Sequence, residues 1–213
     1  MTPGLLVRKL LGKRLFPIVG RYYRAIFVDL SVVAAFMSEQ IPPKAHVLDI
    51  GGGDGEPLNH LLSRRNDVTV TMIDVSKNIG IAISQRYRDR VSVYPQTSIS
   101  QYIGMNLPAP QVIIVSDVIH HIAPPERVAF LNDLHALFRK SNAVLLIKDL
   151  EPGSLIAKLA YLSDRYITMD KNVVPVAREE LRRLIANAFG KVVLSEHPLF
   201  DRDRPNYMFS VRQ

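Results

Sequence analysis

Four glycines lie in one short turn of the sequence. The turn directly follows an apolar run that contains an acid near its end. In VLDIGGGDGEP, residues 47–57, Asp49 lies two positions before Gly51, the first of four glycines. Bare backbone of this kind lets a ligand approach the chain closely. The G-x-G-x-G spacing departs from the dinucleotide fingerprint, and Glu56 at the third glycine position would repel a pyrophosphate. No Gly-Lys-Ser/Thr follows, which excludes a P-loop.

A second acid, Asp74, ends the next apolar run in the motif TMIDVS. A carboxylate at this place can hold ribose hydroxyls, whereas the carboxylate of Asp49 suits a ligand that carries an ammonium group. The expected ligand therefore has an amine, a ribose and no pyrophosphate, and S-adenosylmethionine fits this description. A tight turn without a ligand, with the two aspartates as helix caps, is the weaker interpretation, because four glycines lower stability through backbone entropy.

The motif SDVIHHI, residues 116–122, contributes the groups that could move a proton. Histidine titrates near neutral pH, so His120 is the first candidate for a general base and His121 the second. Capping or packing of the following helix explains the pair equally well. Asp117 either orients a histidine or faces solvent. Two histidines with Asp149 raise the question of a metal, but no recognisable ligand spacing supports one, and we expect none.

Composition excludes several classes of protein. The 213 residues contain no cysteine, so the chain has no disulfides, thiolate metal sites or cysteine nucleophiles. The net charge is +7, and six Lys or Arg residues precede the first acid, Asp29. No stretch provides the roughly 18–20 uncharged apolar residues of a membrane-spanning helix, and charges interrupt every apolar run at the N-terminus. We expect a cytoplasmic protein, with peripheral contact to an anionic membrane surface through residues 1–24 as an additional expectation.

Strand-like and helical patterns alternate through the middle of the chain. Apolar runs predict strands at 46–50, 68–75, 91–94, 112–118 and 143–148. Amphipathic segments between them predict helices, most clearly at 57–65, 77–88 and 125–140. This alternation predicts a parallel sheet with helices on both faces.

The rhythm changes after residue 151. Helices are predicted at 154–166 and 178–189, followed by strands at 191–197 and 207–212. The connection 198–206 is short for a parallel crossover, so the last two strands are predicted to pair as an antiparallel hairpin. We treat 152–176 as an insertion on the substrate side of a domain that spans 41–213.

Residues 1–40 are predicted to form an N-terminal helical extension. An amphipathic helix at 5–16 carries its basic side chains opposite an apolar arc, and a second helix runs from about residue 21 to residue 40. We favour a lid over the cofactor and the pocket. Contact of the basic residues with a membrane is an addition to that role, and it suits a lipophilic acceptor.

The stretch 46–150 resembles the class I S-adenosylmethionine-dependent methyltransferases that act on small molecules. VLDIGGGDG resembles the first motif of that family, TMIDVS the second, VIIVSDVIHHI the fourth and LFRKSNAVLLIKDLEP the fifth, all in family order. The resemblance implies an α/β, Rossmann-like fold. Its seven-stranded sheet is mostly parallel with an antiparallel last strand, has helices on both faces and follows an N-terminal helical extension.

The resemblance also implies which residues hold the cofactor. Asp49 and the glycines at 51–53 would contact the methionine part, Asp74 the ribose and Val75 the adenine. The acidic residue that the family often places near the adenine amino group is missing after the third strand, so that contact must be made otherwise. The predicted cofactor-binding residues are Asp49, Gly51, Gly52, Gly53, Asp74, Val75, Thr97, Ser98 and Ser116.

In an open α/β sheet, the site lies beyond the carboxyl ends of the central strands. Residues 51–55 and 116–121 should reach it together with the end of the fifth strand. Of Lys148, Asp149 and Glu151 at that end, one would touch the substrate and the others would be solvated. The candidate substrate residues are Tyr161, Arg165 and Tyr166, whose spacing fits packing on the sheet equally well.

The expected reaction is methyl transfer by in-line displacement to an oxygen or nitrogen of a small, hydrophobic acceptor. The catalytic candidates are Asp117, His120 and His121. The basic charge keeps an RNA methyltransferase as an alternative, but SDVI is not the Pro-Pro-aromatic element of enzymes that methylate base amino groups, so we do not expect a nucleic-acid partner. A non-catalytic, cofactor-binding scaffold is a further alternative, and the intact glycine loop argues against it.

Overall fold

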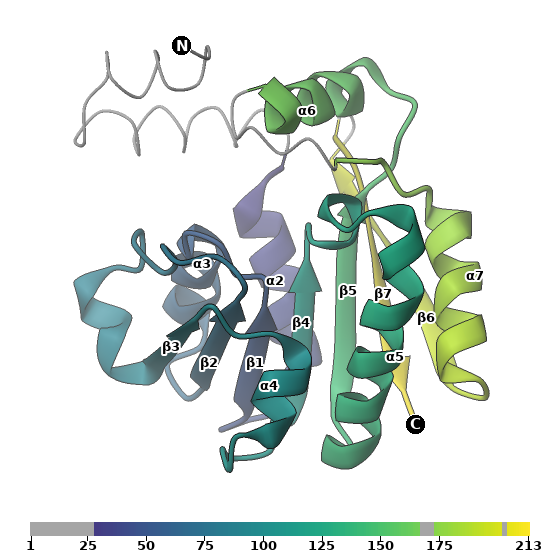
Figure 1. Ribbon diagram of the computed structural model, residues 1–213. Coiled ribbons are helices and arrows are strands. Elements are labelled where there is room, and N and C mark those ends of the chain that lie inside the picture. The colour runs from purple at the N-terminus through teal and green to yellow at the C-terminus, as the bar shows by residue number, and fades with distance from the viewer. Residues whose placement is uncertain (1–27, 167–172, 202–203) are drawn as a thin grey trace.

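Seven strands form one sheet in the order β3-β2-β1-β4-β5-β7-β6 (Figure 1). The computed structural model describes residues 28–166, 173–201 and 204–213. The strands are β1 (His46–Ile50), β2 (Thr69–Asp74), β3 (Val91–Pro95), β4 (Val112–Ser116), β5 (Val144–Leu150), β6 (Val193–Asp201) and β7 (Arg204–Arg212). β1 to β5 pair in parallel, and β7 runs antiparallel to both of its neighbours. The predicted sheet, with its antiparallel last strand, is confirmed.

Helices cover both faces of this sheet, as the alternating pattern predicts. Successive side chains of a strand point to opposite faces, and Val47 and Leu48 accordingly belong to different hydrophobic cores. Helices α2 (Leu30–Gln40) and α3 (Glu56–Arg64) cover one face. The other face is covered by α4 (Ile99–Gly104), α5 (Pro124–Ser141) and α7 (Arg178–Phe189). Helix α6 (Leu155–Tyr166) lies beyond the carboxyl ends of the strands (Figure 1).

The helix predicted at 77–88 is wrong. Only a 3₁₀ helix forms in this region, at Gln85–Arg90. The backbone N–H of Gly80 donates to the carbonyl oxygen of Gly53 at 2.9 Å, and Gly80 has a φ of +64°, which lies outside the helical region. The segment therefore uses its polar backbone groups to hold the glycine loop instead of forming a helix of its own.

The connection between the last two strands is shorter than predicted. β6 and β7 remain paired as far as Asp201 and Arg204, within the segment 198–206 that the sequence indicated as a loop. The longer pairing gives hydrogen-bond partners to backbone N–H and C=O groups that would need other partners in a long loop.

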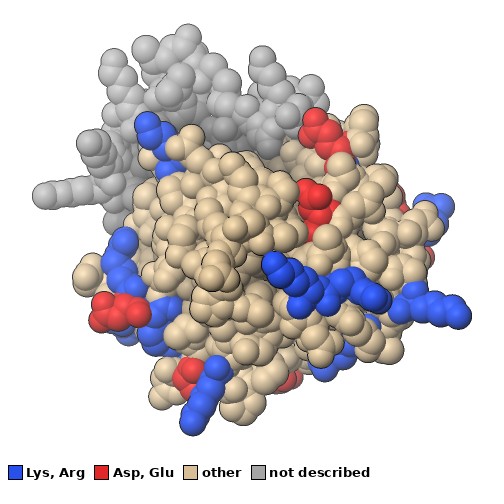
Figure 2. All heavy atoms as spheres, turned by 60° about the horizontal axis from the view of Figure 1, so that its bottom comes forward, with Lys and Arg blue, Asp and Glu red and all other residues tan. Residues whose placement is uncertain are grey.

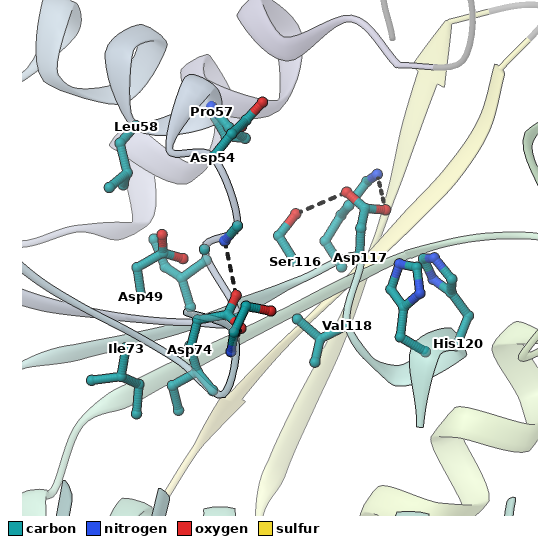
Figure 3. A pocket seen from close by; sticks show the side chains of 18 of the residues that line it. Asp49, Asp54, Pro57, Leu58, Ile73, Asp74, Ser116, Asp117, Val118 and His120 are labelled. Carbon is teal, nitrogen blue, oxygen red and sulfur yellow. Dashed lines mark hydrogen bonds and ion pairs between the residues drawn. The ribbon is translucent and has the colours of Figure 1, made fainter. Parts of the chain in front are cut away.

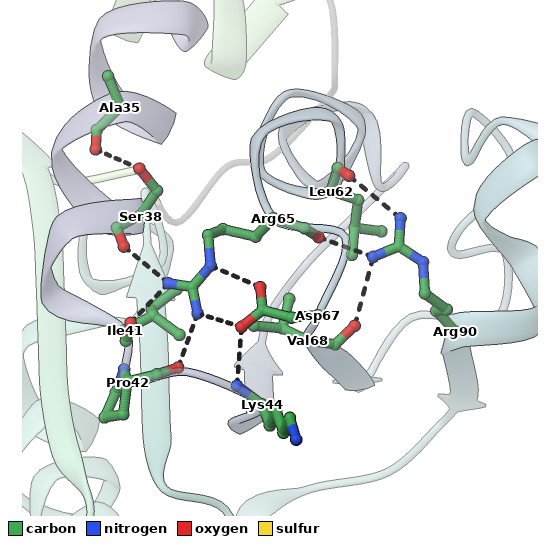
Figure 4. Close-up of polar contacts among 10 residues, drawn as sticks. All are labelled: Ala35, Ser38, Ile41, Pro42, Lys44, Leu62, Arg65, Asp67, Val68 and Arg90. Atoms are coloured by element: carbon green, nitrogen blue, oxygen red, sulfur yellow. Dashed lines mark hydrogen bonds and ion pairs between the residues drawn. The ribbon is translucent and has the colours of Figure 1, made fainter.

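Arg65 fixes α2 to the turn between α3 and β2 (Figure 4). Its guanidinium donates to the carbonyl oxygens of Ser38 at 2.8 Å, Ile41 at 2.5 Å and Pro42 at 2.7 Å. These carbonyls lie at the C-terminal end of α2, where intrahelical donors run out. Asp67 accepts two further hydrogen bonds from Arg65, which lower the pKa of its carboxyl group. Arg65 thus anchors the C-terminal end of α2, and the N-terminal end of the helix lies at the cavity described below.

Residues 1–27 lie outside the described residues, so the helix predicted at 5–16 and most of the predicted lid remain predictions. Asp29 caps the first described helix, accepting from the N–H groups of Ser31 and Val32. Within the described ranges, no helix is both long and apolar enough to span a bilayer.

Candidate active site

A cavity of about 860 Å³ opens at the carboxyl ends of β1, β2 and β4 (Figure 3). The glycine loop forms one wall, and residues that follow β4 form the wall opposite it. The rest of the lining is apolar and includes Val33, Ala34, Met37, Leu58, Leu61 and Phe130. This volume is near the upper end of the roughly 300–1,000 Å³ that is usual for small-molecule sites.

The glycine loop has a backbone conformation and packing that other residues would disturb. Gly51 and Gly53 have φ values of +71° and +55°, where a side chain causes strain. A Cβ on Gly52 would lie 2.3 Å from Oδ2 of Asp49. A Cβ on Gly53, by contrast, would project into open space. The loop therefore presents uncovered backbone to the cavity.

Asp49 is a nearly buried acid on the wall of this cavity, exposed to only 7%. The described part of the chain offers its carboxylate no hydrogen-bond donor. Burial, and secondly the charge of Asp74, raise the pKa of Asp49 to about 7. A cationic group bound beside it would relieve both penalties, so the geometry fits a ligand with an ammonium group.

Asp74 lines the cavity and also braces the glycine loop. Its Oδ2 accepts from the N–H of Gly53 at 3.1 Å, and its Oδ1 accepts from the N–H of Ser76 at 2.8 Å. Each carboxylate oxygen has a second lone pair, so the group can still accept from hydroxyls of a ligand. Val75, beside it, is exposed at the mouth of the cavity.

Three predicted cofactor residues line the cavity with hydroxyl groups that already have partners. Thr97 donates to the carbonyl oxygen of Pro95 at 3.1 Å. Ser98 caps α4 in a capping box. Ser116 donates to Oδ2 of Asp117 at 3.2 Å. Their side chains therefore have a local structural role as well as a place beside the predicted ligand.

Lys148 and Asp117 form an ion pair on the opposite wall, with Nζ and Oδ1 separated by 2.6 Å. Lys148 is fully buried. Asp117 has a φ of +57°, a strained value for a residue with a side chain. Burial acts to raise the pKa of Asp117, but Lys148, His120 and Ser116 outweigh it and the pKa is lowered.

His120 is paired with Asp149, which is fully buried as Lys148 is. The expectation that two of the three residues Lys148, Asp149 and Glu151 are solvated is therefore wrong. The His120 Nδ1 lies 2.7 Å from Oδ1 of Asp149. An ionised carboxylate only accepts, so Nδ1 is assigned as the donor and Nε2 is the basic nitrogen of the neutral ring. Asp149 also accepts from the N–H of Leu150 at 2.8 Å. The carboxylate that contacts the histidine thus comes from β5, whereas Asp117 pairs with Lys148.

The neighbouring residues fix the position of His120. The N–H of Val174 donates to the His120 carbonyl oxygen at 2.9 Å. His121 lies against its ring, with centroids 4.1 Å apart, and Tyr161 meets it edge-on at 5.6 Å. Both of these residues line the cavity, as does His120 itself.

The candidate substrate residues can be placed only in part. The Tyr161 hydroxyl donates to the carbonyl oxygen of Leu150 at 2.6 Å, so this side chain both packs α6 on the sheet and lines the cavity. The side chains of Arg165 and Tyr166 lie outside the described residues.

Three side chains are close enough together to be considered as metal ligands. They are Asp117, His120 and Asp149, and one potential ligand atom from each lies within 4.8 Å of the other two. Lys148 already supplies positive charge to Asp117, and His120 is hydrogen-bonded to Asp149. We therefore interpret the cluster as two side-chain pairs.

Lys148 and Asp149 are the functional candidates that the sequence reasoning undervalued. A signal was present, because both follow an apolar strand at its carboxyl end, as Asp49 and Asp74 do. The contribution of α2 to the cavity had no such signal, since its lining residues are ordinary aliphatic ones.

Residues 22–194 match a family model described as a methyltransferase domain. The chain therefore belongs to this family of enzymes, whose cofactor is S-adenosylmethionine. A search of curated protein sequences gave no match.

Solved structures of methyltransferases share the fold. An O-methyltransferase from neocarzinostatin biosynthesis, in complex with S-adenosylmethionine and 2-hydroxy-5-methyl naphthoic acid, is 20% identical with a TM-score of 0.59, over 83% of this chain and 51% of that one. An O-methyltransferase family 2 protein from Planctomyces limnophilus, in complex with apigenin, is 18% identical with a TM-score of 0.60, over 84% and 57%. This chain thus spans about half the length of these two proteins. A SAM-dependent methyltransferase from Archaeoglobus fulgidus is 14% identical with a TM-score of 0.61, over 87% and 95%.

The site fits the cofactor of the family. The buried carboxylate of Asp49 suits the ammonium group, the open backbone at Gly53 allows close approach, and Asp74 retains acceptor capacity for ribose hydroxyls. Their roles, like those of the other predicted site residues, remain predictions.

Proposed function

We propose that this enzyme transfers a methyl group to a hydroxyl of a small, apolar molecule, with His120 as the general base and Asp149 as the residue that orients it. The observation that carries the proposal is the buried pair of Nδ1 and Oδ1 at 2.7 Å on the wall of the cavity. A hydroxyl must lose its proton as its oxygen is methylated, and a positioned base assists that loss. A neutral amine attacks through its own lone pair and does not need to lose a proton first. The histidine base therefore favours an oxygen atom over a nitrogen atom as the methyl acceptor.

Each part of the chain has a defined task in this proposal. Bound S-adenosylmethionine supplies an electrophilic methyl group and leaves as S-adenosylhomocysteine. Asp49, the glycine loop and Asp74 hold the cofactor. The acceptor oxygen forms its bond to the methyl carbon while its proton moves to Nε2 of His120. Asp149 stabilises the imidazolium ion that results, and the proton then passes to solvent.

Lys148 supports the same chemistry by its charge. Lys148 is one of the residues that line the cavity, and its ammonium group is held by Asp117 at 2.6 Å. A fixed positive charge stabilises an oxygen that becomes negative as its proton leaves. The aliphatic lining contributed by α2 and α3 favours an acceptor with an apolar body.

Nucleic acid is a less suitable acceptor. Figure 2 shows the side of the molecule away from the cavity, and on that side the Lys and Arg side chains form separate groups with Asp and Glu among them, so no continuous basic track runs across it. A duplex requires such a track, because phosphate contacts supply most of the affinity.

The test is methyl transfer to a matched pair of acceptors, 1-naphthol and 1-naphthylamine, followed by mass spectrometry. We expect methylation of the naphthol. His120→Ala should lower turnover by roughly 100-fold, while the affinity for S-adenosylhomocysteine, measured by calorimetry, stays within about twofold. His121→Ala is the matched control and should retain most of the turnover.

Two results would contradict the proposal. Exclusive methylation of the amine would show that no base is needed. Equal losses of turnover in the two histidine variants would mean that the ring pair packs the site and that neither ring moves the proton.

A further inference from the structure

Helix α6 is apolar on two opposite faces. Its inner face, with Ala157, Ala160 and Tyr161, packs in a cluster with Leu150 and Val173. Its outer face carries large aliphatic side chains that are exposed to 74%, 49% and 50%, at Leu155, Leu159 and Leu162 respectively. A helix with apolar residues on two opposite faces normally has both of these faces covered. No other helix of the described ranges carries more than one exposed large hydrophobic residue.

The outer leucines form one stripe with a basic flank. Positions 155, 159 and 162 follow the i, i+4, i+7 spacing of a single helix face. The exposed Lys158 lies beside this stripe. Leucines that enter an apolar phase, beside a lysine whose charge stays at its surface, are the pattern of a helix that lies in a membrane interface.

The stripe lies directly outside the candidate active site. Ala160 and Tyr161, on the inner face of the same helix, line the cavity. Figure 1 shows α6 beyond the carboxyl ends of the strands, where the cavity opens. The leucine stripe and the cavity therefore lie on opposite sides of the same helix.

Charge indicates what covers the stripe. The first 24 residues contain six Lys or Arg and no acid, and this segment leads to Val28, which lines the cavity. Residues 155–162 of α6 include Lys158 and no acid. Over its whole length α6 also contains Asp164 and Arg165, which leaves a net charge of +1, so the basic segment and α6 are both attracted to an anionic surface.

We infer that α6 is a membrane-docking element, with Leu155, Leu159 and Leu162 entering the outer layer of an anionic bilayer. The six Lys or Arg residues among residues 1–24 add electrostatic attraction to such a surface. Docking in this orientation places the cavity next to the apolar phase from which a lipophilic molecule can enter. The inference concerns binding to lipid, so it does not depend on the proposed base or acceptor.

The absence of tryptophan allows a direct test. Leu159→Trp introduces a single reporter on the stripe, and Ile81→Trp introduces one at a similarly exposed aliphatic residue outside α6. Both variants are mixed with phosphatidylcholine vesicles that contain either no anionic lipid or about 30% phosphatidylglycerol. We expect the emission of the Leu159→Trp protein to shift to the blue with anionic vesicles and to be quenched by brominated lipid. The Ile81→Trp emission should not change.

A second set of variants measures the contribution of the stripe. Leu155→Ser, Leu159→Ser and Leu162→Ser together should weaken binding to anionic vesicles by about 100-fold, because apolar contact is lost. The matched control combines Ile81→Ser, Val128→Ser and Val193→Ser, which are exposed to 67%, 53% and 59% elsewhere on the protein. It should bind vesicles as the wild type does. Calorimetry with S-adenosylhomocysteine verifies that each protein is folded.

Several outcomes would overturn the inference. One is wild-type protein that does not bind anionic vesicles, and another is equal binding by the two triple variants. A dimer in gel filtration that dissociates only in the α6 variant would assign the stripe to a second copy of the chain. If the α6 variant does not fold, the tryptophan reporter decides alone, and an unchanged emission counts against docking.

Discussion

The two walls of the cavity are built by different means. The cofactor wall, with Asp49, the glycines at 51–53 and Asp74, depends on backbone conformation and on one short segment packed against another. The acceptor wall depends on side-chain pairs that join β5 to residues following β4, namely Lys148 with Asp117 and Asp149 with His120. A wall made of backbone tolerates almost no substitution, whereas a wall made of side-chain pairs can be altered one function at a time.

The largest effect is expected from a substitution at Gly52, which belongs to the cofactor wall. A Cβ there would lie 2.3 Å from Oδ2 of Asp49 and 2.5 Å from Cε of Met72. Gly52→Ala must displace the acid, and we expect the affinity for S-adenosylhomocysteine to fall by about 100-fold, which corresponds to about 3 kcal/mol of overpacking. Calorimetry provides the measurement. Gly104→Ala is the control, because a Cβ at Gly104 meets nothing within 4 Å; equal losses in both variants would refute this account of the cofactor wall.

The next largest effect is expected at Asp149. Asp149→Asn removes the charge that fixes the tautomer of His120, so turnover should fall by about 30-fold, a part of the roughly 10²–10⁴-fold that general base catalysis contributes. Binding of S-adenosylhomocysteine should remain near wild type, since Asp149 belongs to the other wall. Steady-state kinetics and calorimetry on the same preparations test both points. Asp89→Asn, at an exposed position, serves as the control. A loss of cofactor affinity that matches the loss of turnover would mean that the walls are not independent.

Asp49 should make cofactor binding to the cofactor wall depend on pH. Its pKa is raised to about 7 in the unliganded protein, and an ammonium group favours the ionised form, so binding lowers the pKa and releases a proton. Affinity for S-adenosylhomocysteine should therefore rise by about tenfold between about pH 6 and pH 8. In Asp49→Asn this rise should disappear.

The stability of the unliganded protein should have the opposite dependence on pH. Because the folded pKa of Asp49 exceeds the unfolded one, the folded state retains a proton that the unfolded chain releases. The free energy of unfolding should thus decrease as the pH rises from about 4 to about 7. Urea unfolding at several pH values measures this, and an identical profile in Asp49→Asn would exclude Asp49 as the cause.

The smallest effect is expected at Arg127, a buried residue that supports the acceptor wall. Its guanidinium donates to the carbonyl oxygens of Ile122 at 3.1 Å and Val174 at 2.6 Å and to Glu180 at 2.9 Å. Val174 in turn donates to the backbone of His120. Arg127→Lys cannot replace all three contacts. The free energy of unfolding should fall by about 1–3 kcal/mol, and turnover by about threefold as His120 becomes less well positioned.

Denaturant titration and steady-state kinetics separate these two effects. Arg88→Lys, at an exposed residue, should change neither. Full turnover in a destabilised Arg127→Lys protein would show that the segment around Val174 holds the fold together without positioning the histidine.

The fold could be predicted to a large extent because its strands are long apolar runs. The bounds of β1 (His46–Ile50) and α7 (Arg178–Phe189) agree with the sequence patterns. The segment 77–88 could not be predicted, because its backbone bonds to the glycine loop and tertiary contacts override its helical pattern. The short helix α4 was also missed, although the capping box at Ser98 was a signal for it.

The order of the strand motifs and the glycine turn of the cofactor wall follow from the sequence alone, since a glycine turn between an apolar strand and a helix is encoded by adjacent residues. Only the tertiary structure decided the partners on the acceptor wall. The parallel register aligns Ser116 with Lys148, and this alignment brings Asp117 and His120 to the end of β5. Pairing between strands depends on how the whole sheet assembles, so the residues around Lys148 and Asp149 carry no local signal for it.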